Sequence, residues 1–191
     1  MGHDQTRSTP APTGNLQLWI LRHAKAAEGQ PGGRDRDRPL TARGRRDAGA
    51  LGVHLAADGP LFDTPGLVRP GRALCSVAVR TVQTAELVLG QLADPVPLDT
   101  YRSLYEAEPD TVLAYVRESD EHAGSVLVVG HNPTMFHVTW DLLSPGSPDR
   151  ERVDSTGFPT CTLAVVDLGV QAWGDVVAGQ GALLGLFNPP Y

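Results

Sequence analysis

Apolar and polar positions along the chain form short continuous apolar runs separated by segments with helical spacing. Apolar residues fill 16–21 except for one glutamine, run without a break through 126–129, and form a shorter run over 73–75. Near-continuous apolar runs of four to eight residues are typical of strands buried on both faces of a sheet. The pattern therefore predicts strands at these three places.

Helical patterns follow each of these runs. Thr41 is suited to cap a helix with an apolar stripe, and a second helix begins at Val79. A third helix is predicted over 110–118, and Asn132 can cap a fourth, which is largely apolar. Strands that alternate with helices predict an α/β fold: a three-layer α/β/α sandwich around a mostly parallel central sheet.

The two ends of the chain differ from this regular pattern. Residues 1–15 contain little that can pack, and we interpret them as a flexible N-terminal extension before a single domain over 16–191. Near the C-terminus, 160–167 alternates like a strand, and 173–177 is predicted to pair with it.

Composition restricts the classes of function. The chain has 191 residues, 41% of them hydrophobic, and a formal net charge of −6, which argues against a nucleic-acid partner. No apolar run reaches the roughly 18 to 20 residues of a membrane span, so no membrane partner is expected. Cys75 and Cys161 lie in apolar runs and are expected to be free thiols, consistent with a reducing cytoplasm.

Candidate chemistry lies where the predicted strands end. Arg22 and His23 follow the first apolar run, Arg80 lies in the first turn of the helix after the second, and His131 follows the run that ends at Val129. The carboxyl ends of parallel strands meet at one edge of a sheet, so these four residues are expected to converge. Arginines and a histidine that can be neutral and nucleophilic indicate phosphate chemistry.

The motifs around these residues resemble the histidine phosphatase superfamily. They occur in the family's order and cover most of 16–177: Leu21-Arg22-His23-Ala24-Lys25, Arg38-Pro39-Leu40-Thr41 with Arg43-Gly44, Arg80 before Gln83-Thr84-Ala85, and Val129-Gly130-His131-Asn132-Pro133. The resemblance implies a phosphoglycerate mutase-like fold. Ala24 stands where the mutase and sugar-phosphatase branches usually carry glycine, and this makes the chain similar to the SixA-type phosphohistidine phosphatases.

The resemblance also implies a mechanism. His23 would attack a phosphoryl group and form a phosphohistidine enzyme intermediate, which water then hydrolyses. Arg22, Arg80 and a protonated His131 would hold the transferring oxygens, so that no metal and no other cofactor is expected. Asn132 and Arg38 complete the candidate substrate-binding residues, and a phosphate or sulfate ion is expected to occupy the same place.

The general acid is the weakest part of this scheme. The acid phosphatase branch has an aspartate after its second histidine, but an amide such as Asn132 cannot protonate a leaving group. Glu106 is the best remaining candidate by resemblance, although an exposed carboxylate with no catalytic role explains it equally well. Glu28 is a weaker candidate.

The missing proton donor favours one substrate class. An alkoxide leaving group needs protonation, and losing that assistance typically costs about 10² to 10⁴ in rate, whereas imidazole leaves more readily from a phosphoramidate. We therefore expect protein phosphohistidine as the substrate. Two alternatives stay open: a phosphomonoesterase for a small metabolite such as a sugar phosphate or nucleotide, and a phosphate- or phosphoprotein-binding module without turnover.

Overall fold

A six-stranded sheet forms the centre of the molecule in the computed structural model, which describes residues 14–56 and 59–191. The strands lie in the order β3-β2-β4-β1-β5-β6; β1 to β4 run parallel, and β5 is antiparallel to both of its neighbours. Their bounds are β1 Gln17–Arg22, β2 Arg72–Ser76, β3 Leu98–Tyr101, β4 Ser125–Gly130, β5 Leu163–Asp167 and β6 Ala182–Phe187. The predicted α/β fold with a mostly parallel sheet is confirmed.

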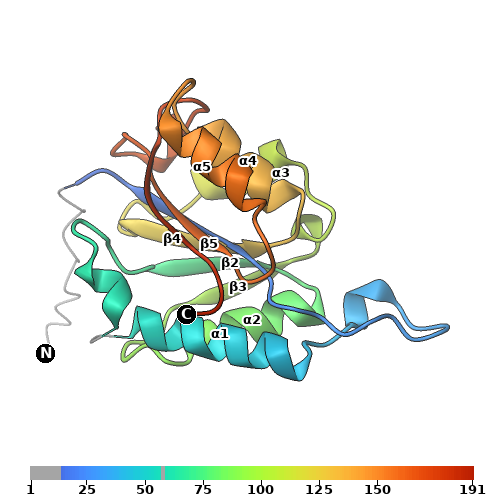
Figure 1. Cartoon of the computed structure of the whole chain (residues 1–191). Coiled ribbons are helices and arrows are strands. Elements are labelled where there is room, and N and C mark those ends of the chain that lie inside the picture. The colour runs from blue at the N-terminus through green and yellow to red at the C-terminus, as the bar shows by residue number, and fades with distance from the viewer. Residues whose placement is uncertain (1–13, 57–58) are drawn as a thin grey trace, which may run out of the picture.

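Helices cover both faces of the sheet, as Figure 1 shows. One layer contains α1 and α2, and the other contains α3, α4 and α5. The helix bounds are α1 Ala42–Leu55, α2 Val79–Leu89, α3 Pro109–Arg117, α4 Thr134–Leu142 and α5 Pro148–Thr156. The sheet therefore separates two hydrophobic clusters, one under each helical layer.

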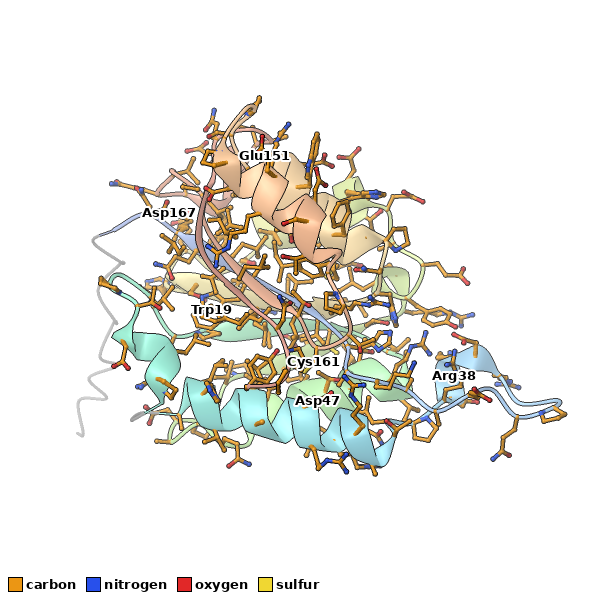
Figure 2. All side chains as sticks on the ribbon, in the orientation of Figure 1. Trp19, Arg38, Asp47, Glu151, Cys161 and Asp167 are labelled. Carbon is orange, nitrogen blue, oxygen red and sulfur yellow. The ribbon has the colours of Figure 1, made fainter. Side chains whose placement is uncertain are left out.

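Strand β1 shows why its apolar run is nearly unbroken. Leu18 and Ile20 belong to the cluster under α3 and α4, whereas Trp19 and Leu21 belong to the cluster under α1 and α2. All four side chains are completely buried, and Figure 2 shows Trp19 close to the sheet, in the interior of the molecule. A strand between two helical layers has no solvent face, so alternation with polar residues is not expected.

The prediction for the C-terminal region was wrong in part. Residues 173–177 do not pair with β5; Trp173–Asp175 is a short 3₁₀ helix, and the partner of β5 is β6. Trp173 and Val176 are buried in the same hydrophobic cluster as α3 and α4, and the Trp173 indole donates a hydrogen bond to the Ala123 carbonyl over 3.0 Å. One helical turn brings residues three apart to the same side, which a strand cannot do.

The helix starts were predicted with mixed success. Thr41 caps α1 as expected, because its hydroxyl oxygen accepts a hydrogen bond of 3.0 Å from the Gly44 amide. Asn132 does not cap α4: the helix starts at Thr134 after Pro133 without a side-chain cap. The Asn132 amide instead donates to the Phe158 carbonyl over 3.1 Å.

Residues 1–13 of the predicted N-terminal extension lie outside the described residues, and packing begins at Leu16, which is fully buried. Within 14–56 and 59–191, no helix has the length and apolar character that crossing a membrane requires.

Gly44 offers a test of how tightly α1 is seated. A Cβ atom at this position would overlap the backbone carbonyl oxygen of Lys25, in the segment that directly follows His23. We expect Gly44→Ala to destabilise the protein by about 1 to 3 kcal/mol, because backbone must move to relieve the overlap. Thermal unfolding followed by circular dichroism measures this.

Gly49 provides the matched control in the same helix. An added Cβ there meets nothing within 4 Å. Gly49→Ala is therefore expected to raise the unfolding free energy by roughly 0.5 to 1 kcal/mol through helix propensity. Similar melting temperatures for the two variants would show that α1 adjusts to Gly44→Ala without cost.

Candidate active site

Three adjacent parallel strands bring the candidate residues to one edge of the sheet. Arg22 ends β1, His131 directly follows β4, and Arg80 lies in the first turn of α2 after β2. Because the strand order is β2-β4-β1, these carboxyl ends are neighbours. The ring centroids of His23 and His131 lie 5.2 Å apart, in an edge-on arrangement. Residues far apart in the chain thus form one cluster.

The His23 ring is oriented by its own backbone. Nδ1 lies 2.8 Å from the Ala24 carbonyl oxygen, which can only accept, so the proton resides on Nδ1 and the lone pair on Nε2. Burial, opposed by this hydrogen bond and assisted by the charge of Arg80, lowers the pKa of His23 from 6.5 to about 4. His23 is therefore a neutral imidazole with a free nucleophilic nitrogen at neutral pH.

The segment after β1 is attached to α2. The Ala24 amide donates a 3.0 Å hydrogen bond to the Thr84 hydroxyl oxygen, and that hydroxyl donates to the Arg80 carbonyl over 2.6 Å. The His23 amide donates to the Gly130 carbonyl over 3.0 Å. These bonds hold the backbone at His23 and Ala24 against α2 and against the end of β4.

Arg22 and Asn132 share one acceptor. Arg22 Nη1 donates to the Phe158 carbonyl over 2.8 Å, and Asn132 Nδ2 donates to the same oxygen. Phe158 is fully buried and has a φ of 46°, in the left-handed region that non-glycine residues seldom adopt. Backbone strain of this kind often occurs at functional sites, and here it accompanies the placement of a carbonyl that orients two polar side chains.

Arg80 is held by Asp35, a residue from the loop before α1. The Arg80 side chain is 8% exposed; its Nη1 donates to the Asp35 carbonyl over 2.8 Å, and its Nη2 donates to Asp35 Oδ2 over 2.9 Å. Tyr105 donates to the same Oδ2 over 2.7 Å, and Arg38 Nη1 donates to Oδ1 over 2.6 Å. Hydrogen bonds from Tyr105 and Arg38 hold the pKa of Asp35 well below its usual range. Asp35 is thus an ionised anchor for the Arg80 cation.

His131 differs from expectation in its charge. Its Nε2 lies 2.8 Å from the Ser76 hydroxyl oxygen, and the Tyr105 ring packs against it at 5.5 Å between centroids. Burial, followed by the proximity of His23 and Arg80, lowers the pKa of His131 to about 3. The site by itself therefore favours a neutral His131, and a protonated His131 around a transferring phosphoryl group stays a prediction. A phosphoryl group would have to bring the proton or raise this pKa through its negative charge.

The two lowered pKa values give a direct test by NMR. Histidine pKa values lowered to about 4 and about 3 mean that both rings stay neutral as the pH falls from about 8 to 5.5, whereas an unperturbed histidine titrates near 6.5. We expect the ring signals of His23 and His131 to be constant over this range. Added tungstate should move the midpoint of His131 upward. A midpoint near 6.5 for either ring without an oxyanion would contradict the burial argument.

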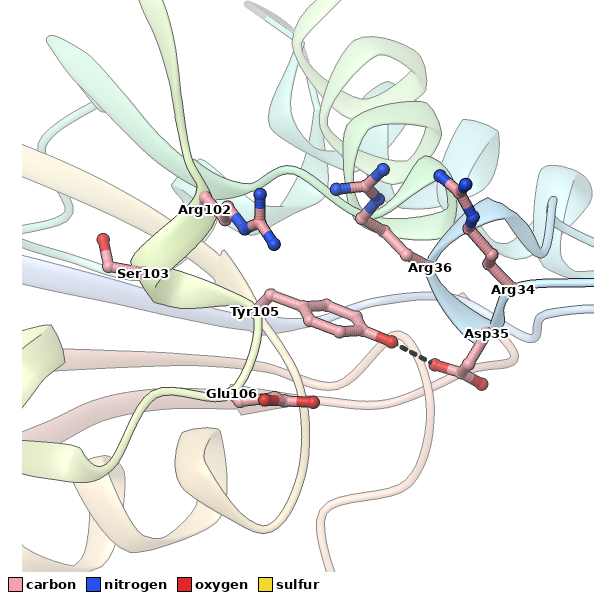
Figure 3. Close-up of a pocket in the computed structure, with 7 residues that line it drawn as sticks. All are labelled: Arg34, Asp35, Arg36, Arg102, Ser103, Tyr105 and Glu106. Carbon is pink, nitrogen blue, oxygen red and sulfur yellow. Dashed lines mark hydrogen bonds between the residues drawn. The ribbon is translucent and has the colours of Figure 1, made fainter.

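Two other predicted residues lie nearby in different settings. Arg38 is half-buried and donates to the Ala27 carbonyl as well as to Asp35, so it supports the Asp35 anchor. Glu106 is exposed and lies beside Tyr105 along a pocket of about 770 Å³ next to the site, shown in Figure 3. Among residues 14–56 and 59–191, no three His, Cys, Asp or Glu side chains form a group that could hold a metal ion.

Several residues of the site were missed by sequence reasoning. Asp35 was not identified, because nothing in the alternating run of arginines and aspartates over 34–38 distinguishes it from Asp37. Ser76, Tyr105 and Phe158 act here through a hydroxyl, a ring and a carbonyl. Tyr105 had one available signal, its position next to Glu106 in the family's acidic region.

Known proteins resemble this chain over nearly all of its length. The family model described as the histidine phosphatase superfamily (branch 1) matches residues 18–112. An uncharacterized protein of Mycobacterium tuberculosis strain H37Rv is 36% identical over 173 residues, which cover 88% of this chain and 99% of that protein.

Solved structures agree with this family match. A candidate phosphohistidine phosphatase SixA from Agrobacterium tumefaciens is 30% identical, with a TM-score of 0.73 over 92% of this chain and 99% of that chain. The protein histidine phosphatase SixA complexed with tungstate is 26% identical, with a TM-score of 0.69 over 91% and 97%. A phosphoglycerate mutase from Plasmodium falciparum, 16% identical with a TM-score of 0.54 over 90% and 89%, shares the fold and confirms it as phosphoglycerate mutase-like.

Proposed function

Because the chain belongs to branch 1 of the histidine phosphatase superfamily, we propose that it is a phosphatase that removes phosphate from protein phosphohistidine through a His23 intermediate. The observation that carries this proposal is the His23 ring. Its Nδ1 is turned to the Ala24 carbonyl, and two arginines and a second histidine surround it.

The first step is an in-line attack. Nε2 of His23 donates its lone pair to phosphorus, and the bond from phosphorus to the leaving nitrogen of the substrate imidazole breaks. The Ala24 carbonyl stabilises the positive charge that develops on the His23 ring, since its hydrogen bond with Nδ1 strengthens as the ring becomes cationic. The products are phosphohistidine at His23 and a neutral imidazole on the substrate, whose ring takes its proton from solvent.

The second step is hydrolysis. Water attacks the phosphorus, the bond to Nε2 breaks, and inorganic phosphate leaves with His23 restored. Arg22 and Arg80 supply positive charge to the equatorial oxygens in both steps, and their guanidinium groups are already positioned by the Phe158 carbonyl and by Asp35. Because both guanidinium groups are already held in place, they do not have to reorganise when the phosphoryl group is transferred.

The lack of a strong general acid in the site supports this substrate class. Glu106 is exposed, His131 has a pKa of about 3, and Asn132 cannot donate an acidic proton, so none of the three is a strong general acid at neutral pH. A phosphoramidate needs less proton assistance than an ester. The SixA names of the structural relatives point to the same substrate. A cytoplasmic location stays a prediction, consistent with two buried free cysteines.

The test compares the rates on two substrates and measures the effect of removing the Glu106 carboxylate. We expect phosphate release from a phosphohistidine-bearing protein to exceed release from an alkyl phosphomonoester such as a sugar phosphate. Glu106→Gln should change the phosphohistidine rate by less than about threefold, because imidazole leaves without a strong acid. Glu151→Gln on α5 (Figure 2) is the matched control, since Glu151 is also exposed and does not line the pocket.

One result favours the alternative of a small-metabolite phosphomonoesterase. A monoester hydrolysed faster than phosphohistidine, with a loss of about 10² or more in Glu106→Gln, would make Glu106 the general acid. Its position along the pocket is the observation that keeps this alternative open.

A further inference from the structure

The pocket beside the site is lined by two segments that are distant in sequence. Residues 34–36 of the loop before α1 form one wall, and residues 102–106 after β3 form the other (Figure 3). Tyr105 connects the pocket to the site, because its hydroxyl binds Asp35 and its ring packs against His131. The pocket therefore lies next to the place where His23 would hold a phosphoryl group.

Three guanidinium groups line the pocket, those of Arg34 and Arg36 from one wall and that of Arg102 from the other (Figure 3). Arg34 and Arg102 are exposed, and their side chains have no hydrogen bond or ion pair with any residue in the described part of the chain. Arg36 has one weak ion pair, at 3.8 Å from Asp37. These cations are available to a partner.

The acidic residues of the pocket do not cancel this charge. Asp35 already accepts from Arg38, Arg80 and Tyr105, so its carboxylate is used within the site. Glu106 lies beside Tyr105, and Figure 3 shows its carboxylate apart from the three guanidinium groups. The pocket is thus a cationic area on a chain whose formal net charge is −6.

We propose that Arg34, Arg36 and Arg102 form a docking surface for acidic side chains next to the phosphohistidine of the protein substrate. This inference rests on the proposed function. It adds that the protein prefers phosphohistidine substrates with acidic residues close to the phosphohistidine. A site for a second anion of a small molecule is typically concave and largely encloses its ligand. Here Arg34 and Arg102 are exposed and Arg36 is half-buried, so each contact is weak and screened by solvent, and several such contacts on an acidic protein surface are needed for a useful effect.

The overall charge strengthens the argument. An acidic partner is repelled by the net charge of −6 and attracted at this cationic area next to the site. Complementary charge next to the reacting group orients the encounter and raises the association rate, and salt suppresses the effect. The expected signature is a salt-sensitive kcat/KM for acidic substrates.

The test uses two short synthetic peptides, each with one phosphohistidine, flanked by glutamates in one and by glutamines in the other. Phosphoramidate serves as the small substrate with no flanking groups. At low salt, we expect kcat/KM for the glutamate peptide to exceed that for the glutamine peptide by about tenfold, and about 0.5 M salt should remove most of this preference.

The variant is the pair Arg34→Glu and Arg102→Glu, which spares Arg36 because Arg36 is half-buried and pairs with Asp37. It should reduce kcat/KM for the glutamate peptide by about tenfold or more, and affect phosphoramidate far less. Arg152→Glu on α5 is the control for charge reversal outside the pocket, since Arg152 is exposed and does not line it, and it is compared with Arg34→Glu and with Arg102→Glu as single variants.

Each other outcome overturns the inference. Equal rates for the two peptides in the wild-type protein would remove it and leave the proposed function intact. An equal loss on phosphoramidate and on peptide would assign the arginines to the phosphoryl site instead. If the arginine variant lowers kcat/KM for a small substrate with a second phosphate but not for the glutamate peptide, the pocket binds a metabolite. No turnover of any phosphohistidine substrate would remove the proposed function and this inference together.

Discussion

His23→Ala is expected to reduce phosphate release by at least about 10⁴-fold, because the nucleophile that splits the reaction into two steps is lost. Alanine has no group that can accept the phosphoryl group. A water molecule is not held in line with the leaving group in the way that Nε2 of His23 is. Rapid quench with a radiolabelled phosphohistidine substrate measures both the turnover and the covalent intermediate. The label should appear on wild-type protein in an acid-labile form and be absent from the variant.

His137→Ala is the control for this experiment. His137 is exposed on α4 and outside the catalytic cluster, so its removal should leave turnover and labelling unchanged. Label on the His23→Ala protein, or residual turnover within about tenfold of wild type, would show that another residue is the nucleophile.

Arg80→Ala is expected to lower kcat/KM by about 10² to 10³, the range typical for loss of one preorganised group that stabilises transition-state charge. The loss has two sources. The cation next to the transferring oxygens disappears, and the Asp35 carboxylate loses its closest buried partner and repels the incoming phosphoryl group. The inhibition constant for tungstate should rise along with the loss of rate, because the same cation binds both anions.

A double variant separates these two sources. Asp35→Asn removes the carboxylate charge and keeps an oxygen that can accept from Tyr105. In the Arg80→Ala background it should recover about tenfold of the lost kcat/KM, because the repulsion is gone. Strictly additive effects would mean that Asp35 only holds the position of Arg80. Thermal melts of all variants control for unfolding.

The regular part of the fold could be predicted because its signals are local. The apolar runs that form β1 and β4 and the Thr41 cap of α1 depend on residues that are close in sequence. Strand β6 was not predicted, since it lies at the edge of the sheet with mixed burial, and a register shift between Val165 and Val166 interrupts the pairing pattern with β5. Helix α5 was also not assigned; only Val153 of its nine residues is buried, so it has no apolar stripe.

The candidate site shows the same division. Arg22, His23, Arg80 and His131 were found because each lies at the end of a predicted strand or the start of the helix after it. Their supporting residues could not be found in this way. Asp35 contacts Arg80 from 45 positions away and Tyr105 from 70 positions away.

The sequence by itself determined which residue types stand at the ends of the parallel strands, and therefore the reaction class. Hydrophobic periodicity and strand-end chemistry are properties of neighbouring residues. Only the tertiary structure decided which nitrogen of His23 is free, that His131 is neutral, and that Asp35 anchors Arg80. These properties depend on burial and on hydrogen bonds between distant segments, and such contacts exist only once the chain is packed.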